Sequence, residues 1–163
     1  MTVLRSATDP EALTFSITSE FTATPERIWQ LWSDPRQLEQ WWGPPDWPAT
    51  FVDHDFVPGG EARYYMTGPD GEKAHGWWSF VTIDPHRAIV FDDGFADDSG
   101  APDREMPTMR GHMELQPDGD VTRMVITTRF ASAEQLEQVV GMGMVEGMTG
   151  ALGQIDAILA AQP

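Results

Sequence analysis

The sequence contains no cysteine, which excludes a disulfide framework, a thiol nucleophile and a cysteine-ligated zinc site. It also has a single lysine, Lys73, and its 10 basic residues face 26 acidic ones, so that the formal net charge is −16. Such a charge repels the phosphates of nucleic acids and of anionic membranes, and neither is expected as a partner. We interpret the acidity as a solvated surface that keeps the protein soluble.

Long apolar runs are missing as well. No stretch approaches the roughly 18 residues that a membrane-spanning helix needs, and the N-terminus lacks the basic and apolar segments of a secretory signal. We therefore expect a cytoplasmic protein. Residues 1–12, with their Ser, Thr, Asp and Pro, are expected to be a loose lead-in, and residues 13–163 fit one domain whose apolar content suffices for a core.

The first part of the chain predicts a strand followed by two short helices. Apolar and polar residues alternate over 13–21, as in a half-buried strand. Thr24-Pro25 and Asp34-Pro35 each combine an N-cap residue with proline at the first helical position. Gly43-Pro44-Pro45 then ends the second helical segment.

The middle of the chain predicts strands joined by tight turns, at residues 50–56, 61–67, 73–83, 88–92, 108–116 and 121–130. Consecutive hairpins imply an antiparallel sheet. Residues 93–107 are rich in Asp, Gly and Pro and are predicted to form the longest loop. Its acidic residues lack the spacing of a calcium loop, so we interpret them as solvating groups and expect no metal site.

The last part predicts one long amphipathic helix over 133–160, beginning at a Ser132–Gln135 capping box. The fold class is therefore α+β: a curved antiparallel sheet of about six to seven strands wrapped around the C-terminal helix, with two short helices after the first strand. Five glycines interrupt this helix, each at a cost of about 1 kcal/mol. They either let the helix pack closely on the sheet or leave room for a ligand; they are Gly141, Gly143, Gly147, Gly150 and Gly153.

A tryptophan-rich segment carries a family resemblance. The pattern Trp29-x-x-Trp32-Ser-Asp-Pro-x-x-Leu38-x-x-Trp41-Trp42-Gly43-Pro44 resembles the opening signature of the AHSA1-like family, named after the activator of Hsp90 ATPase. Pro58-Gly59-Gly60-x-x-Arg63-Tyr64 and Gly143-Met144-Val145-Glu146-Gly147-Met148 are also similar to that family. The resemblance covers roughly residues 13–160. It implies the helix-grip fold of the START/Bet v 1-like (SRPBCC) superfamily.

The resemblance further implies a hydrophobic cavity between the sheet and the last helix. Superfamily members bind lipids, sterols, polyketides or plant secondary metabolites, and some are cyclases, aromatases or hydrolases, but AHSA1-like members share no catalytic set. Met148 stands where the family often has tryptophan, and Ala62 where an aromatic is common. Both changes remove bulk and would enlarge or reshape a cavity that these positions face.

Alternation along the strands and periodicity along the helix suggest which side chains line that cavity. The candidates are Trp42, Phe51, Tyr64, Met66, Trp77, Met124, Ile126, Met144 and Met148. A shift of one residue in a strand would exchange its candidates for their neighbours. For catalysis, Asp53, His75 and Arg110 are the candidates if they point inward, whereas His54 is expected to be exposed and Arg110, His112 and Glu114 to share a solvated outer face.

Three functions stay open at this point. The leading hypothesis is binding of a small hydrophobic or aromatic molecule. The first alternative is an enzyme, similar to a cyclase, aromatase or hydrolase, that acts on such a ligand in the same pocket. The second is a protein-interaction module of the Hsp90-cochaperone kind. A homodimer formed through the aromatic helices is also considered, and no cofactor is expected because neither a nucleotide motif nor a covalent cofactor site is visible.

Overall fold

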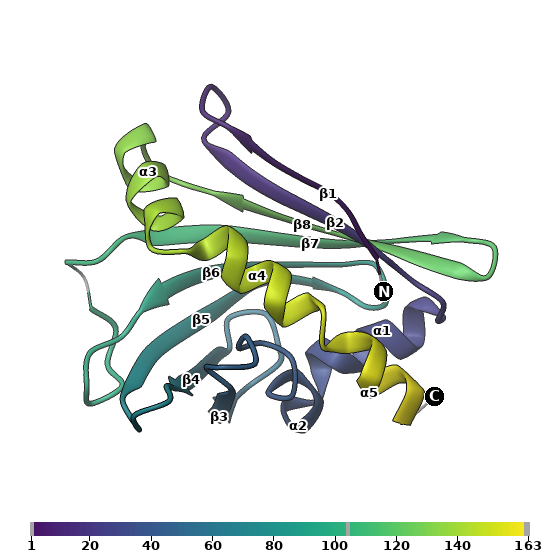
Figure 1. The fold of residues 1–163 in the computed structure, drawn as a ribbon, viewed down its shortest axis with the longest axis horizontal. Helices are drawn as coiled ribbons and strands as arrows, with labels where there is room; N and C mark the ends of the chain where they lie inside the picture. Colours follow the sequence, from purple (N-terminus) through teal and green to yellow (C-terminus); the bar gives the residue numbers. More distant parts are fainter. Residues whose placement is uncertain (1, 104, 162–163) are drawn as a thin grey trace.

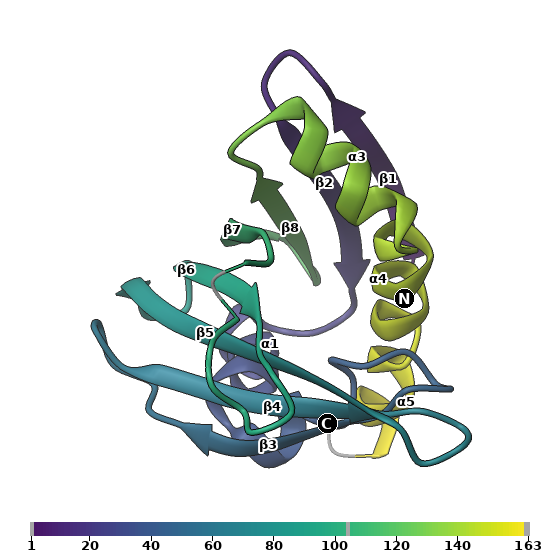
Figure 2. The same cartoon turned by 90° about the vertical axis from the view of Figure 1, so that its left-hand side faces the viewer.

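Eight strands form one antiparallel sheet in the computed structural model, which describes residues 2–103 and 105–161. Their order across the sheet is β1-β2-β8-β7-β6-β5-β4-β3, so that between β2 and β3 the chain crosses from the strand next to one edge to the strand at the other edge. Figure 2 shows the sheet bending around the C-terminal helices. The strands are β1 (Thr2–Asp9), β2 (Thr14–Phe21), β3 (Ala49–His54), β4 (Glu61–Thr67), β5 (Lys73–Asp84), β6 (Ala88–Phe95), β7 (Thr108–Asp118) and β8 (Val121–Arg129).

The strand β1 corrects the expectation of a loose lead-in. Residues 2–9 pair with β2, and the Asp9 carboxylate accepts the backbone N–H groups of Glu11 and Ala12 to close the turn between the two strands. The strand adds hydrogen bonds along an edge of β2 that would otherwise be unpaired. The described sheet therefore has one strand more than the upper limit of the prediction.

Both short helices begin where the sequence predicts. The side chain of Thr24 accepts the N–H of Arg27 at 3.2 Å and starts α1 (Pro25–Ser33). The Asp34 carboxylate accepts the N–H of Arg36 at 3.0 Å and starts α2 (Pro35–Leu38). These caps need only residues within one turn, which is why the sequence reveals them.

A cluster of tryptophans attaches the short helices to the sheet. The ring of Trp32, from α1, lies 5.0 Å from that of Trp41 and 6.0 Å from that of Trp78 on β5, centroid to centroid. Trp42 meets Trp78 edge to face at 4.6 Å. All four side chains are buried. This aromatic cluster closes one end of the space between sheet and C-terminal helices.

The predicted long C-terminal helix is broken into α3 (Ala133–Gly141), α4 (Met144–Leu152) and α5 (Ile155–Ala161). Ser132 caps α3 as predicted, accepting the N–H of Gln135 at 3.1 Å. The first break lies at Gly143, whose φ of 91° belongs to the left-handed region and interrupts the right-handed helix. Periodicity continues across this break, which is why it predicts a single helix. Over the described ranges no helix is long and apolar enough to span a membrane.

The second break is held against the aromatic cluster. The Nε2 of Gln154, between α4 and α5, donates to the carbonyl oxygen of Gly43 at 2.6 Å. A Cβ atom on Gly150 would lie 3.5 Å from the Pro44 side chain, so α4 passes close to this segment. The end of α4 is therefore fixed while α3 and the start of α4 extend over the concave side of the sheet (Figure 1).

Because the helix is broken at Gly143, alanine substitutions at Gly143 and Gly147 should change the free energy of unfolding in opposite directions. Gly143→Ala puts a Cβ on a left-handed residue and should lower the free energy of unfolding by about 1 kcal/mol. Gly147→Ala adds a better helix former within α4, where a Cβ meets no atom within 4 Å, and should raise it by up to about 1 kcal/mol. Urea denaturation followed by circular dichroism measures both. Stabilisation by both substitutions would indicate a continuous helix and contradict the break.

Candidate functional site

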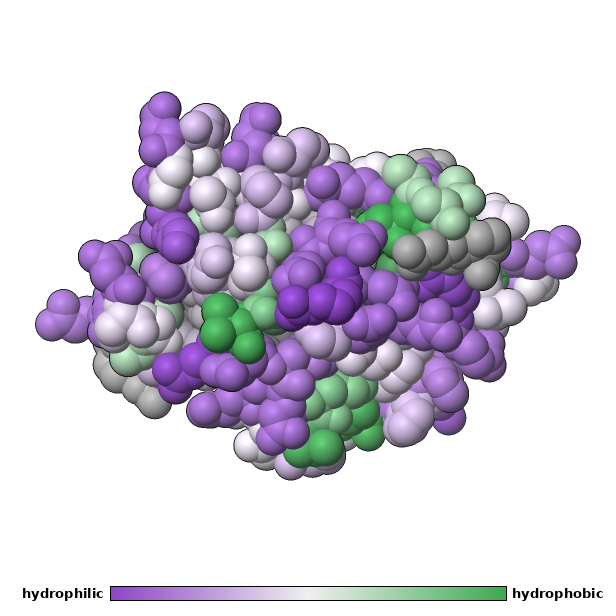
Figure 3. Space-filling view, turned by 90° about the horizontal axis from the view of Figure 1, so that it is seen from below, coloured by the Kyte–Doolittle hydropathy of each residue, from purple (hydrophilic) through white to green (hydrophobic). Residues whose placement is uncertain are grey.

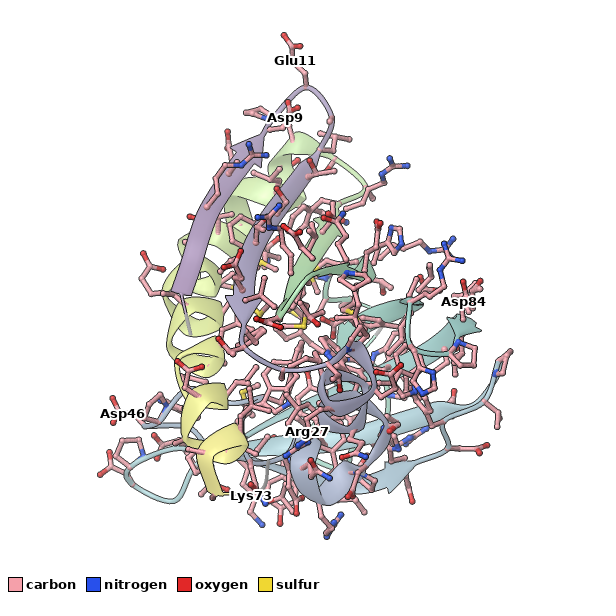
Figure 4. All side chains as sticks on the ribbon, turned by 90° about the vertical axis from the view of Figure 1, so that its right-hand side faces the viewer. Asp9, Glu11, Arg27, Asp46, Lys73 and Asp84 are labelled. Carbon is pink, nitrogen blue, oxygen red and sulfur yellow. The ribbon has the colours of Figure 1, made fainter. Side chains whose placement is uncertain are left out.

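A cavity of about 600 Å³ lies between the sheet and the helices α3 and α4. The sheet contributes residues from β4 to β8, the helices contribute their facing side, and the segment after α2 closes one wall. Figure 4 shows side chains from these layers meeting in the interior, with methionine sulfurs among them. The lining residues are Trp42, Pro44, Trp47, Tyr64, Met66, Ala74, Phe91, Asp93, Gly94, Phe95, Met109, Gly111, Ile126, Thr128, Val139, Met142, Gly143, Met144, Gly147 and Met148.

Six of the side chains suggested from the sequence line this cavity: Trp42, Tyr64, Met66, Ile126, Met144 and Met148. They come from three parts of the fold: the segment after α2, the sheet and α4. Met148, one of the two positions where the family resemblance implies a loss of bulk, is among the lining residues. Ala62 is fully buried but is not among the lining residues.

The other three suggested side chains lie elsewhere. Phe51 is stacked on Tyr64 at 5.0 Å, one layer behind the cavity wall. Met124 lies under the aromatic cluster, where its sulfur accepts the N–H of Trp32 at 3.4 Å. Trp77 lies on the outer face of β5, over Gly94, and donates to the carbonyl oxygen of Phe95 at 3.0 Å.

Trp77 is a register error in the prediction. In the pair Trp77-Trp78 the second residue points inward, where its ring lies 4.7 Å from Phe91. Because successive side chains of a strand point to opposite faces, only one of the two can reach the interior. Two adjacent tryptophans give no sign from sequence of which one that is.

The catalytic candidates lie outside the cavity. Asp53 is exposed, His75 packs against Tyr65 at 5.7 Å on the outer face, and the exposed Arg110 pairs with Asp92 at 2.9 Å. His112 and Glu114 share the solvated outer face with Arg110, as expected. An enzyme that uses Asp53, His75 and Arg110 together in the cavity is therefore inconsistent with the fold.

His54 differs from its expected exposed position. It is half-buried, with Nε2 3.1 Å from the carbonyl oxygen of Trp32 and its ring stacked 5.5 Å from Phe56. Burial lowers the pKa of this histidine, while the Trp32 carbonyl acts in the opposite direction. Its contacts tie the end of β3 to α1.

Asp93 lines the cavity although the sequence does not predict it there. The sequence predicts that the strand ends at residue 92 and that Asp93 lies in a solvated loop, whereas β6 continues to Phe95. Phe91, Asp93 and Phe95 follow at intervals of two and all line the cavity. The alternation of Ile89, Phe91 and Phe95 was the available signal, because it puts the carboxylate between them on the inward face.

Burial raises the pKa of Asp93 to about 7. The indole N–H of Trp78 lowers this pKa in part, although neither that N–H nor the N–H of Trp42 reaches the geometry of a formed hydrogen bond. Burial also raises the pKa of the Tyr64 phenol, and the negative charge of Asp93 adds to that effect. Asp93 and Tyr64 are therefore two electrostatically coupled polar groups in a space whose walls are mainly apolar.

Glycines determine how the rings lie against the sheet. A Cβ atom on Gly76 would collide with the ring of Tyr64, and one on Gly111 would lie 2.6 Å from the ring of Phe91. Each ring therefore extends over the neighbouring strand at a residue that has no side chain. At Gly147 of α4 a Cβ would meet nothing within 4 Å, which favours the interpretation that this helical glycine leaves room for a ligand.

The aromatic helical pair does not form an exposed surface for dimerisation. Trp29, Trp32, Trp41 and Trp42 are all at most 7% exposed. The face seen in Figure 3 is mainly hydrophilic, with small separate apolar patches. Among residues 2–103 and 105–161 no three His, Cys, Asp or Glu side chains are grouped so as to hold a metal ion.

The pKa of Asp93 predicts how stability depends on pH. Folded Asp93 binds its proton more tightly than the unfolded chain, whose aspartates titrate near about pH 4. The stability linked to this proton is therefore fully present below about pH 4 and is lost as the pH rises to about 7. Asp93→Asn should remove this slope and raise the free energy of unfolding at pH 8 by roughly 2 kcal/mol, which is less than the full shift implies because Asp93 is only partly shielded from solvent.

Urea denaturation at pH 5 and pH 8 measures the effect. The matched control is Asp92→Asn, which lies one residue away on the outer face and breaks only the exposed pair with Arg110. It should leave the slope unchanged. Equal pH slopes for wild type and Asp93→Asn would show that Asp93 does not titrate in this range.

Comparison with known proteins agrees with this architecture. The family model described as Activator of Hsp90 ATPase homolog 1-like protein matches residues 22–160, and no curated protein matches the chain. A solved protein from Arthrobacter aurescens is 53% identical, with a TM-score of 0.94 over 98% of this chain and 93% of its own. Protein Ms6760 from Mycobacterium smegmatis is 45% identical, with a TM-score of 0.91 over 99% of each chain. This chain therefore belongs to the Activator of Hsp90 ATPase homolog 1-like family and has its helix-grip fold.

Proposed function

We propose that the protein binds a small hydrophobic or aromatic molecule in the cavity between the sheet and the C-terminal helices. The observation that carries this proposal is the cavity itself, with a volume of about 600 Å³ and mainly apolar and aromatic walls. Ligand pockets in proteins typically have volumes of about 300–1,000 Å³ and such linings. The interior of an ordinary domain is packed without voids of this size.

The composition of the walls supports an adaptable binding site. Methionines Met66, Met109, Met144 and Met148 contribute flexible, polarisable side chains that adjust to ligands of different outline. The sheet side is more rigid, because Tyr64 and Phe91 are packed against glycines and against neighbouring rings. A rigid floor and a pliable helical wall suit a flat apolar molecule.

The alternatives have less support. The residues suggested for catalysis, Asp53, His75 and Arg110, lie outside the cavity, which weakens the enzyme hypothesis. The hypothesis of a protein-interaction module rests on the family description rather than on a feature of the surface. A cytoplasmic location and a homodimer remain predictions from the sequence.

Blocking the cavity tests the proposal. Gly147→Phe places a ring in the open space beside α4 and should weaken binding of 2-naphthylmethanol, a neutral aromatic probe, by at least about tenfold, since the probe loses its apolar contact area. Isothermal titration calorimetry measures the change. Gly141→Phe is the matched control, because Gly141 is exposed and outside the cavity. Equal affinities for the two variants, or no binding to wild type, would contradict the proposal.

A further inference from the structure

The charge of the cavity points to a ligand class. Among the described residues that line it, Asp93 is the one that carries a carboxylate, and none of them is a lysine, an arginine or a histidine. Its carboxylate has no salt bridge among the described residues, whereas the adjacent Asp92 is paired with Arg110 on the other face. A carboxylate in an apolar space without a counter-ion is costly unless something supplies the positive charge.

The surroundings of Asp93 suit an organic cation. The aromatic rings of Trp42, Tyr64, Phe91 and Phe95 line the same cavity. The faces of such rings attract ammonium groups, and aromatic walls combined with an anion are a common way to bind them. We propose that the ligand is an apolar or aromatic molecule with one protonated amine, which pairs with the carboxylate of Asp93. This inference rests on the proposed function and specifies its ligand.

The net charge of the whole protein also favours a positively charged ligand. A net charge of −16 raises the local concentration of small cations and lowers that of anions. The one lysine does not compensate Asp93, because its Nζ lies over the ring of Tyr65 at 4.4 Å, on the outer face, and Figure 4 shows Lys73 at the periphery. Fatty acids and other carboxylates would meet repulsion both outside and inside.

The groups that face Asp93 determine how binding depends on pH. Trp78 lies opposite it on β5, Met109 opposite it on β7, and Tyr64 of β4 shares the cavity, with Val139, Met144 and Met148 on the helical side. None of these competes for a proton near neutral pH. Arg63, His75 and Arg110 belong to the outer face of the same strands. Affinity for a cation should therefore rise as Asp93 loses its proton and then level off.

The test compares two probes that differ mainly in charge, 2-naphthylmethylamine in its protonated form and neutral 2-naphthylmethanol, by isothermal titration calorimetry with the full chain. At pH 8 the amine should bind at least about tenfold more tightly than the alcohol, which corresponds to about 1.4 kcal/mol. The preference should shrink to less than about threefold in Asp93→Asn and persist in Asp92→Asn. Between pH 5.5 and 8 the affinity of the amine should rise and that of the alcohol stay constant.

Each other result overturns the inference in a recognisable way. Equal binding of both probes to wild type, or a preference that survives in Asp93→Asn, means that Asp93 does not select a cation. Tighter binding of the alcohol means that Asp93 acts as a neutral hydrogen-bond donor. In these cases the alcohol still binds, and the proposed function stands. If neither the amine nor the alcohol binds, the proposed function itself is contradicted.

Discussion

The packing of Trp32 against Trp41, Trp42 and Trp78 is the contact on which the rest of the structure depends. It fixes the segment after α2 on the concave face of the sheet. From that position the segment supplies the cavity wall at Trp42 and Trp47 and presents the carbonyl of Gly43 to Gln154. Without this cluster neither the wall nor the anchor of the C-terminal helices would have a defined position. Three tryptophans of the family signature, Trp32, Trp41 and Trp42, thus belong to this cluster, whereas its first tryptophan, Trp29, packs against Phe56.

Features that depend on a few neighbouring residues could be predicted, and those that depend on distant partners could not. The caps at Thr24 and Asp34 are local, and both helices begin where expected. The inward face of Trp77-Trp78 depends on the register of β5, which the neighbouring strands decide. The edge strand β1 likewise forms because β2 offers it a partner. The family resemblance predicts an apolar cavity between the sheet and the last helix. It does not predict the carboxylate of Asp93 in that cavity, since an aspartate after a strand normally indicates a turn.

Asp93 also shows where this fold departs from the design of a purely stable core. Phe91 and Phe95 on either side of it contribute apolar surface, whereas the carboxylate between them must be partly desolvated. A hydrophobic residue at that position would suit the interior better. Proteins tend to keep such locally unfavourable groups at sites of function, where the gain appears on binding rather than on folding.

Gly76 and Gly111 determine the depth of the cavity without being its principal contacts. They lie beneath Tyr64 and Phe91, and a methyl group at either position would push a ring away from the sheet into the empty space. Under the proposed function, the backbone beneath these rings would limit the shape of the ligand together with the side chains that touch it. A relative that gains a methyl group at the position of Gly76 would have a cavity of different depth under an unchanged tyrosine, and a comparison of lining residues alone would overlook the change, because Gly76 is not one of them.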